Sequence, residues 1–249
     1  MLLGDFFDKL KKVLSVEMEK SGVFSDIEII DAIKRGHIVI YPLVKKNIMG
    51  SSVDVTLGHW FYTTELTKNR NFYNPFDKKD VKSYFGEPKK AIVHKKWCDQ
   101  QKRQPFEGIP LNHPIIVLNP GERILAHTHE FIGINPPGTT EMRARSSWGR
   151  NGIAVCFDAG WGDPGYINRW TMEIYNLNER ESVPLPVGER VAQIIFHHTG
   201  EVEHHYSKNG KYQSHPDVEK LVKSWNPEMM LPKAFRDIRV TPKKLECDK

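Results

Sequence analysis

The spacing of hydrophobic residues changes at Gly36, and this change divides the chain into a helical start and a β-rich body. Before Gly36, apolar residues recur every three or four positions, which is typical of amphipathic helices. Segment 1–22 is one predicted helix. SDIEIIDAIKRG (25–36) is a second, in which Ser25 and Glu28 match a capping box and Gly36 marks the end.

After Gly36 the period becomes two, which predicts β-strands. The predicted strands are short β-branched or aromatic runs: HIVIYPL, SVDVTLG, PIIVL, RILAHT, GIAVCF, TMEIYN and RVAQIIF. Turn sequences such as NPGE, NPPG and PVGE separate them. Many short strands with such turns predict a mainly β domain over 23–213, built as a sandwich, jelly roll or barrel.

Two regions depart from this pattern. Residues 65–110 mix lysine, proline and aromatic residues without a clear period, so we expect an insertion there. Residues 214–249 are polar and rich in lysine, so we expect a C-terminal extension with a short helix that then frays.

Composition narrows the setting of the protein. The chain has 249 residues, a formal charge of +5 and three widely spaced cysteines, Cys98, Cys156 and Cys247. Such cysteines suit a reducing compartment, and charged residues interrupt the apolar N-terminal segment, so we expect a cytoplasmic protein without a membrane span. The mildly basic balance suits a polyanionic partner, either a nucleic acid or a triphosphate.

Several catalytic signatures are missing from the sequence. The zinc nucleobase deaminases need His-x-Glu followed by Pro-Cys-x-x-Cys, and neither element is present. The sequence also lacks a Gly-x-Ser-x-Gly elbow and a phosphate-binding glycine fingerprint. The histidine-rich HHTGEVEHH (197–205) follows a predicted strand, and we assign it to a polar surface connection rather than a metal site.

The chemically richest stretch extends from RARSSWGR (143–150) through DAGWGDPGY (158–166) to TMEIYN (171–176). Arg145 and Arg150 have planar guanidinium groups that match phosphate geometry. In a strand over TMEIYN, Thr171 and Glu173 share one face, with Asp163 available from the preceding glycine-rich loop. The residue types alone leave two interpretations open: a nucleotide site, or a surface loop beside a salt-bridged strand.

A series of motifs between Ile27 and Gln213 resembles the dCTP deaminase and dUTPase superfamily, and specifically its dCTP deaminase branch. In family order the matching segments are IKRGHIVIYP, SSVDVTLG, GERILAHTHEFI, RSSWGRNGI, AGWGDPGY, TMEIYN, PVGERVAQIIF and GKYQ. The resemblance implies a dUTPase-like distorted β-barrel or jelly roll, here with N-terminal helices and an insertion. It also implies a homotrimer whose active sites are shared between neighbouring chains.

The resemblance assigns roles to individual residues. Glu173 matches the catalytic glutamate that activates a water for attack on C4 of cytosine, and Arg150 and Ser146 match residues that position them. Other family contacts to the nucleotide fall on Arg145, Ser147, Trp148, Gly149, Ala159, Asp163, Thr171, Met172, Tyr206, Lys211 and Tyr212. Mg²⁺ is expected with the triphosphate, no zinc is expected, and dCTP or dUTP rather than a nucleic acid is the expected partner.

Three positions depart from the family pattern: Asp158, Gly162 and His215. The leading prediction is deamination of dCTP to dUTP and ammonia, supported by the glutamate in TMEIYN and by the KYQ segment. The alternatives are a bifunctional dUMP-forming enzyme or dUTPase, in which Asp163 directs a water to phosphorus, and a non-catalytic nucleotide-binding relative.

Overall fold

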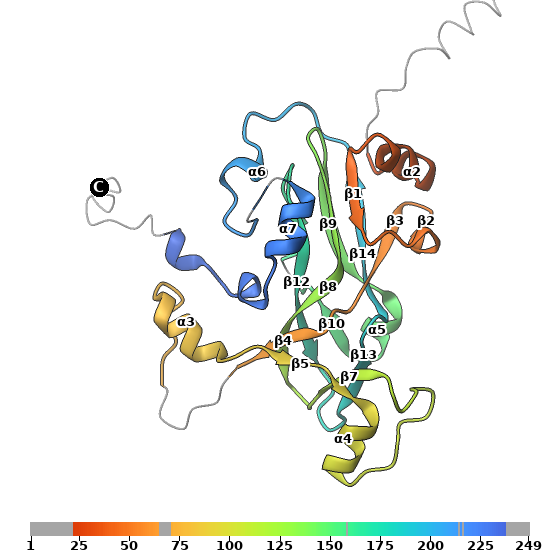
Figure 1. Ribbon diagram of the computed structural model, residues 1–249, viewed down its shortest axis with the longest axis vertical. Coiled ribbons are helices and arrows are strands. Elements are labelled where there is room, and N and C mark those ends of the chain that lie inside the picture. The colour runs from red at the N-terminus through yellow and green to blue at the C-terminus, as the bar shows by residue number, and fades with distance from the viewer. Residues whose placement is uncertain (1–21, 65–70, 158, 214, 216, 238–249) are drawn as a thin grey trace, which may run out of the picture.

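Two β-sheets pack face to face in the computed structural model, which describes residues 22–64, 71–157, 159–213, 215 and 217–237 (Figure 1). The first sheet has the order β10-β12-β8-β4-β5, with β1 also paired to β8. Its strands are β1 (Ile38–Tyr41), β4 (Trp60–Thr63), β5 (Lys89–Lys90), β8 (Arg123–Ile134), β10 (Ile153–Val155) and β12 (Ile167–Asn176).

The second sheet has the order β11-β9-β14-β3-β2, and a small third sheet has the order β13-β7-β6. The strands of the second sheet are β2 (Ile48–Met49), β3 (Ser52–Thr56), β9 (Thr139–Ala144), β11 (Trp161–Gly162) and β14 (Arg190–His197). Those of the third are β6 (Ile92–Val93), β7 (Pro114–Leu118) and β13 (Val183–Pro186). The mainly β prediction is confirmed, and the sheets formed by the described residues stay open rather than closing into a barrel.

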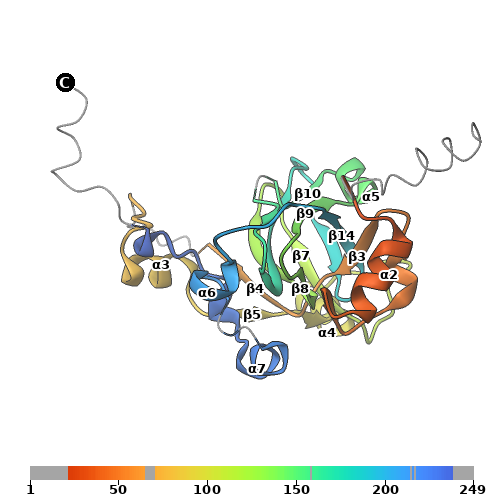
Figure 2. The ribbon, with the colours of Figure 1, turned by 90° about the horizontal axis from the view of Figure 1, so that it is seen from above.

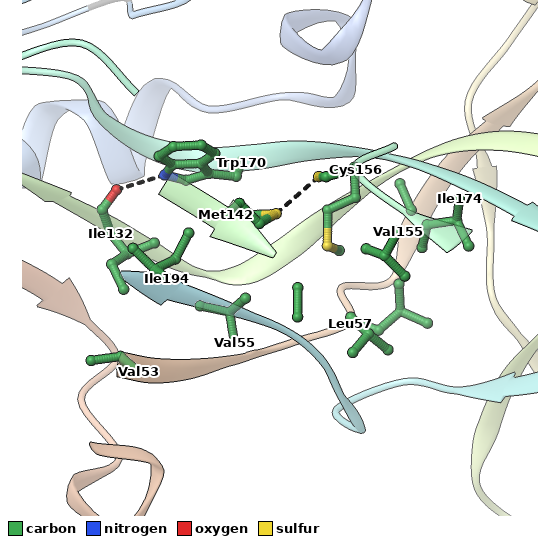
Figure 3. Close-up of a cluster of buried hydrophobic side chains, with 14 of the residues drawn as sticks. Val53, Val55, Leu57, Ile132, Met142, Val155, Cys156, Trp170, Ile174 and Ile194 are labelled. Atoms are coloured by element: carbon green, nitrogen blue, oxygen red, sulfur yellow. Dashed lines mark hydrogen bonds between the residues drawn. The ribbon is translucent and has the colours of Figure 1, made fainter. Parts of the chain in front are cut away.

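The hydrophobic core lies between the two main sheets. Figure 3 shows side chains from both sides: Val53 and Val55 from β3 face Trp170 and Ile174 from β12. All four are almost completely buried. Along β12, half-buried and buried side chains alternate from Arg169 to Asn176, so one set enters this core and the other set lies on the outer face of the sheet.

Helix α2 (Asp26–Lys34) begins with the predicted capping box. The Glu28 amide donates to Ser25 Oγ at 3.3 Å, and the Ser25 amide donates to Glu28 Oε2 at 2.9 Å. These two bonds satisfy amides that the first turn of a helix leaves without partners. The predicted helix over 1–22 falls outside the described residues except for Gly22.

The insertion contains more regular structure than its sequence indicates. It folds into α3 (Lys78–Phe85), β5, β6 and α4 (His94–Gln101). Each helix has eight residues, little more than two turns, which is too short for a helical period to stand out among lysines and aromatics.

The C-terminal extension folds into α7 (Val218–Ser224) and the short 3-10 helices η2 (Pro227–Met230) and η3 (Ala234–Arg236). Figures 1 and 2 place α3, α6 (Tyr206–Asn209) and α7 on one side of the β-sheets, opposite α2. The helices that the structure describes include none with the length and apolarity needed to span a bilayer.

Candidate functional site

A cavity of about 410 Å³ opens on the first sheet, where β11 and β12 meet the segment that follows β14. This volume is within the usual range for small-molecule sites. Its lining consists of Leu125, Ala159, Trp161, Gly162, Asp163, Tyr166, Trp170, Thr171, Glu173, Tyr206, Lys211, Tyr212, Met230 and Pro232. Seven of these residues are ones that the sequence predicted: Ala159, Asp163, Thr171, Glu173, Tyr206, Lys211 and Tyr212.

Strand β12 brings Thr171 and Glu173 to the cavity. Its side chains alternate between buried and half-buried positions, so Thr171 and Glu173 share the outer face, while Met172 is fully buried in the core. The register pairs Thr171 with His127 and Glu173 with Leu125 of β8. The predicted strand face is thus confirmed, and the Met172 side chain does not reach the cavity.

Glu173 lines the cavity and is partly enclosed by the protein. Its Oε2 atom is shielded from solvent, and its carbonyl oxygen accepts a hydrogen bond from the Cys156 amide at 3.0 Å. Burial, with the Glu173 charge as a smaller cause, raises the pKa of the neighbouring Cys156 thiol well above its usual range. The thiol therefore stays protonated near neutral pH.

The strand β11 approaches β12 closely at Gly162, one of the three positions that depart from the family pattern. A Cβ at Gly162 would clash with Thr140 Oγ1 and with the Trp170 ring. The Gly162 carbonyl accepts hydrogen bonds from the hydroxyls of Thr139 at 2.6 Å and Thr140 at 3.2 Å. Trp170 thus occupies the space that a larger residue at position 162 would need. Asp158, which also departs from the family pattern, lies outside the described residues.

Aromatic side chains form one wall of the cavity. The Tyr166 ring packs edge-to-face against Trp170 at 5.2 Å and against Tyr206 at 5.1 Å between centroids. Burial, followed by the nearby phenols of Tyr206 and Tyr212, raises the pKa of Tyr166. Its hydroxyl therefore remains protonated and can donate a hydrogen bond to a ligand.

The segment 206–213 lies along the start of β12 and closes one side of the cavity. Asn168 Nδ2 donates to the Tyr212 carbonyl at 2.6 Å, and the Ile167 amide donates to Gln213 Oε1 at 2.9 Å. His215, the third departure, accepts at Nδ1 from the Asp217 amide at 2.9 Å. This bond lies directly before α7, so His215 helps to lead the chain into that helix instead of extending the segment.

The RSSWGR motif is not part of this cavity within one chain. Its helix α5 (Ser146–Arg150) lies on the other side of the β-sheets from α6 and α7 (Figures 1 and 2). Ser146, Ser147, Gly149 and Arg150 are exposed to solvent there. The structure therefore divides the predicted site residues into a cavity group and a separate group on α5.

The α5 group is nonetheless held firmly in place. Trp148 Nε1 donates to the Arg190 carbonyl at 2.9 Å. Arg145 and Arg190 both pair with the largely buried Asp54 carboxylate, at 3.3 and 3.0 Å. One carboxylate thus fixes the start of α5 against β14, while Arg150 stays available at the surface.

The cavity has a charge balance that does not suit a triphosphate by itself. Asp163 and Glu173 line it, and Lys211 is the one basic residue among the described lining residues. Lys211 also forms an ion pair with Asp237. A triphosphate carries several negative charges, so binding it here requires cations from outside this cavity.

Sequence reasoning missed six cavity residues: Leu125, Trp161, Tyr166, Trp170, Met230 and Pro232. Tyr166 belongs to the quoted DPGY motif and is the one that the sequence could have indicated. Met230 and Pro232 come from the C-terminal extension, about 60 residues beyond β12, and no local pattern marks them.

Two of the histidines in the described part of the chain make structural contacts. Burial lowers the pKa of His127 to about 3, and its Nε2 accepts from the Trp60 amide at 3.2 Å. His198 stacks on Phe24 at 3.7 Å between centroids. No group of three His, Cys, Asp or Glu side chains converges within the described ranges.

Together, the fold and cavity define a mainly β protein with a site large enough for a nucleotide. A family model for dCTP deaminase-like proteins matches residues 23–199. The chain therefore belongs to the dCTP deaminase-like family.

Similar curated proteins support this membership. A protein of Methanopyrus kandleri named "dCTP deaminase, dUMP-forming" is 34% identical over 201 residues, covering 76% of this chain and 90% of the relative. One of Methanosphaera stadtmanae with the same name is 32% identical, covering 80% and 93%. A Halorubrum lacusprofundi protein named "dCTP deaminase" is 31% identical, covering 70% and 76%.

Among solved structures, the 2'-deoxycytidine 5'-triphosphate deaminase from Agrobacterium tumefaciens is 16% identical, with a TM-score of 0.49. That match covers 73% of this chain and 49% of the Agrobacterium chain, so this chain spans about half of the Agrobacterium chain.

Proposed function

We propose that this protein converts dCTP to dUMP by deamination and release of diphosphate. The overall reaction takes one dCTP and two waters to dUMP, ammonia and diphosphate. The observation that supports it is a single cavity lined by both Glu173 and Asp163, which suits two hydrolytic steps on one nucleotide. The relatives from Methanopyrus and Methanosphaera, named dUMP-forming, favour this product over dUTP.

Glu173 is the proposed general base and acid. It takes a proton from a water that attacks C4 of cytosine, and it returns a proton to the amino group that leaves as ammonia. The enclosed position of its carboxylate suits this role, because fixed groups in a water-poor site act more strongly than groups in bulk solvent. Thr171, on the same strand face, is proposed to contact the pyrimidine.

The triphosphate is proposed to bind across two subunits of a homotrimer. Helix α5 and its N-cap Arg145 lie away from the cavity of their own chain, and Lys211 is the one cation among the described residues that line the cavity. A neighbouring α5 would supply the missing positive charge together with Ser146 and Arg150, which position the water and Glu173. A site of this kind is complete only in the oligomer.

Asp163 has two proposed roles, one in substrate binding and one in the release of diphosphate. It accepts a hydrogen bond from the deoxyribose 3′-hydroxyl, or it orients the water that attacks phosphorus when diphosphate leaves. Mg²⁺ is expected with the triphosphate, and the oxygen donors of the cavity fit a hard cation held mainly by phosphate oxygens. When bound, the ion neutralises part of the phosphate charge.

Product analysis tests the proposal. Purified protein with Mg²⁺ is incubated separately with dCTP and dUTP, and ammonia, diphosphate and nucleotides are followed by chromatography. We expect ammonia, diphosphate and dUMP from dCTP. Accumulation of dUTP would instead establish a plain deaminase, whereas turnover of neither substrate would favour a non-catalytic nucleotide-binding protein.

The Glu173→Gln variant serves as the matched control in the same assay. The amide keeps the size of the side chain but cannot accept a proton, so we expect ammonia release to fall by about a thousandfold or more, with nucleotide binding retained. Deamination at a rate near that of the wild type would show that Glu173 is not the base.

A further inference from the structure

The predicted insertion (65–110) and the predicted C-terminal extension (214–249) pack against each other beside the cavity through their described residues. A second hydrophobic cluster joins Val81 and Phe85 of α3 to Met230 and Leu231 of the extension, with Leu125 of β8 beneath them. In Figures 1 and 2 the helix α3 and the end of the described chain lie together on one side of the β-sheets. The extension is therefore a packed part of the molecule.

Trp225, near the start of the described extension, packs against the first sheet. Its ring lies 4.6 Å from the His127 ring, between centroids. The guanidinium carbon of Arg169, a residue of β12, lies 4.6 Å from the Trp225 ring centroid, which is a cation–π distance. Trp225 therefore contacts both central strands that carry the cavity.

Lys233 fastens the other end to the segment that closes the cavity. Its amide donates to Tyr212 Oη at 3.1 Å, and its Nζ donates to the Lys211 carbonyl at 2.8 Å. The Lys233 ammonium also lies 5.0 Å from the Tyr212 ring centroid. Because Tyr212 Oη accepts from Lys233, its hydroxyl hydrogen is left to be donated to a ligand oxygen.

Between these two attachments, Met230 and Pro232 line the cavity together with Thr171 and Glu173. We propose that residues 225–237 form a fixed wall of the nucleotide site and that Lys233 is a positioning residue, which holds Lys211 and Tyr212 in place for the substrate. This inference rests on the proposed function, since it takes the cavity to be the nucleotide site.

Substitution of Lys233 in the full-length chain tests the proposal. Lys233→Met removes the bond to the Lys211 carbonyl and the charge beside Tyr212, while the backbone bond to Tyr212 remains. We expect the KM for dCTP to rise about tenfold, with kcat changed less than about threefold, because the substrate then has to order the segment itself. Lys233→Arg retains a donor and should restore most of the affinity.

Lys223→Met is the matched control. Lys223 is an exposed residue of α7 in the same extension and does not line the cavity, so this variant removes the same charge without the contact. An unchanged KM in Lys233→Met, or an equal rise in Lys223→Met, would overturn the proposal.

Hydrogen exchange of segment 206–213 without nucleotide separates this inference from the proposed function. We expect faster exchange in Lys233→Met and unchanged exchange in Lys223→Met, whether or not the protein turns over dCTP. Equal exchange in the wild type, Lys233→Met and Lys223→Met would contradict the proposal that residues 225–237 form a fixed wall. A wild type that is inactive on dCTP and dUTP would contradict only the proposed reaction.

Discussion

His127 is a buried histidine whose two nitrogens both have backbone partners. Its Nδ1 lies 2.8 Å from the Thr128 carbonyl and its Nε2 accepts from the Trp60 amide, which together fix a neutral ring with the proton on Nδ1. Gly58 permits this arrangement, because a Cβ there would collide with the imidazole. Burial is the main cause that lowers the pKa of His127 to about 3, with the nearby Arg169 charge adding to it.

This pKa makes the protein sensitive to acid. Between the unfolded value of 6.5 and the folded value of about 3, the unfolded chain binds more protons, so stability is complete above that window and falls as pH drops through it. His127 alone should lower the free energy of unfolding by about 2 kcal/mol between about pH 7.5 and pH 5. The lowered pKa values of His37 and His59 act in the same direction.

Urea unfolding at these two pH values measures the effect in the wild type and in His127→Gln. The variant should be less stable at the higher pH, since a packed ring is lost, yet its stability should depend less on pH. Equal pH slopes in both proteins would contradict the assignment.

Single residues also mark the limit of sequence reasoning. The period of TMEIYN was enough to place Glu173 and Thr171 on one strand face, because alternation is a local property. The role of Gly162 was not predictable, because it depends on Thr140 and Trp170, which belong to other strands.

At the scale of elements, α2 and seven strands were predicted because each has a clear period or cap. The seven predicted apolar runs correspond to β1, β3, β7, β8, β10, β12 and β14. The short α3 and α4 were missed for want of such a period. The cavity depends on how β11, only two residues long, approaches β12. No sequence pattern specifies that approach.

Gly162→Ala tests how tightly β11 packs on β12. The added methyl group meets Trp170 and Thr140, so we expect a loss of about 1–3 kcal/mol in the free energy of unfolding. Gly200→Ala is the control, since a Cβ there meets open space. Equal stability of the two variants in urea unfolding would show that β11 can shift at little cost.

At the scale of the whole molecule, the separation of α5 from the cavity is the main result that the motifs did not reveal. The resemblance implied a shared site, but the distribution of motifs along one chain cannot show which residues meet within it. The structure brings Asp163, Thr171 and Glu173 to one cavity and leaves Arg150 exposed elsewhere.

Mixing two inactive variants tests the proposed sharing. Glu173→Gln subunits retain Arg150, and Arg150→Ala subunits retain Glu173, so a mixed trimer contains sites in which both residues are intact. Random assembly at equal amounts should restore about a quarter of the wild-type sites. Ammonia release is measured on the whole co-expressed population, before any selection of mixed trimers.

The control is each variant expressed alone, which should remain inactive. Mixed trimers without activity would indicate that Glu173 and Arg150 of one chain serve the same site.

The packing of α3 against Met230 and Leu231 determines which parts of the chain can be separated from one another. A chain trimmed to the matched region 23–199 would uncover Leu125 and Tyr62, which the extension helps to bury, and would leave α3 without its apolar partner. Such newly exposed apolar patches favour aggregation. For recombination or domain exchange, the insertion and the extension therefore form one unit that has to be transferred together.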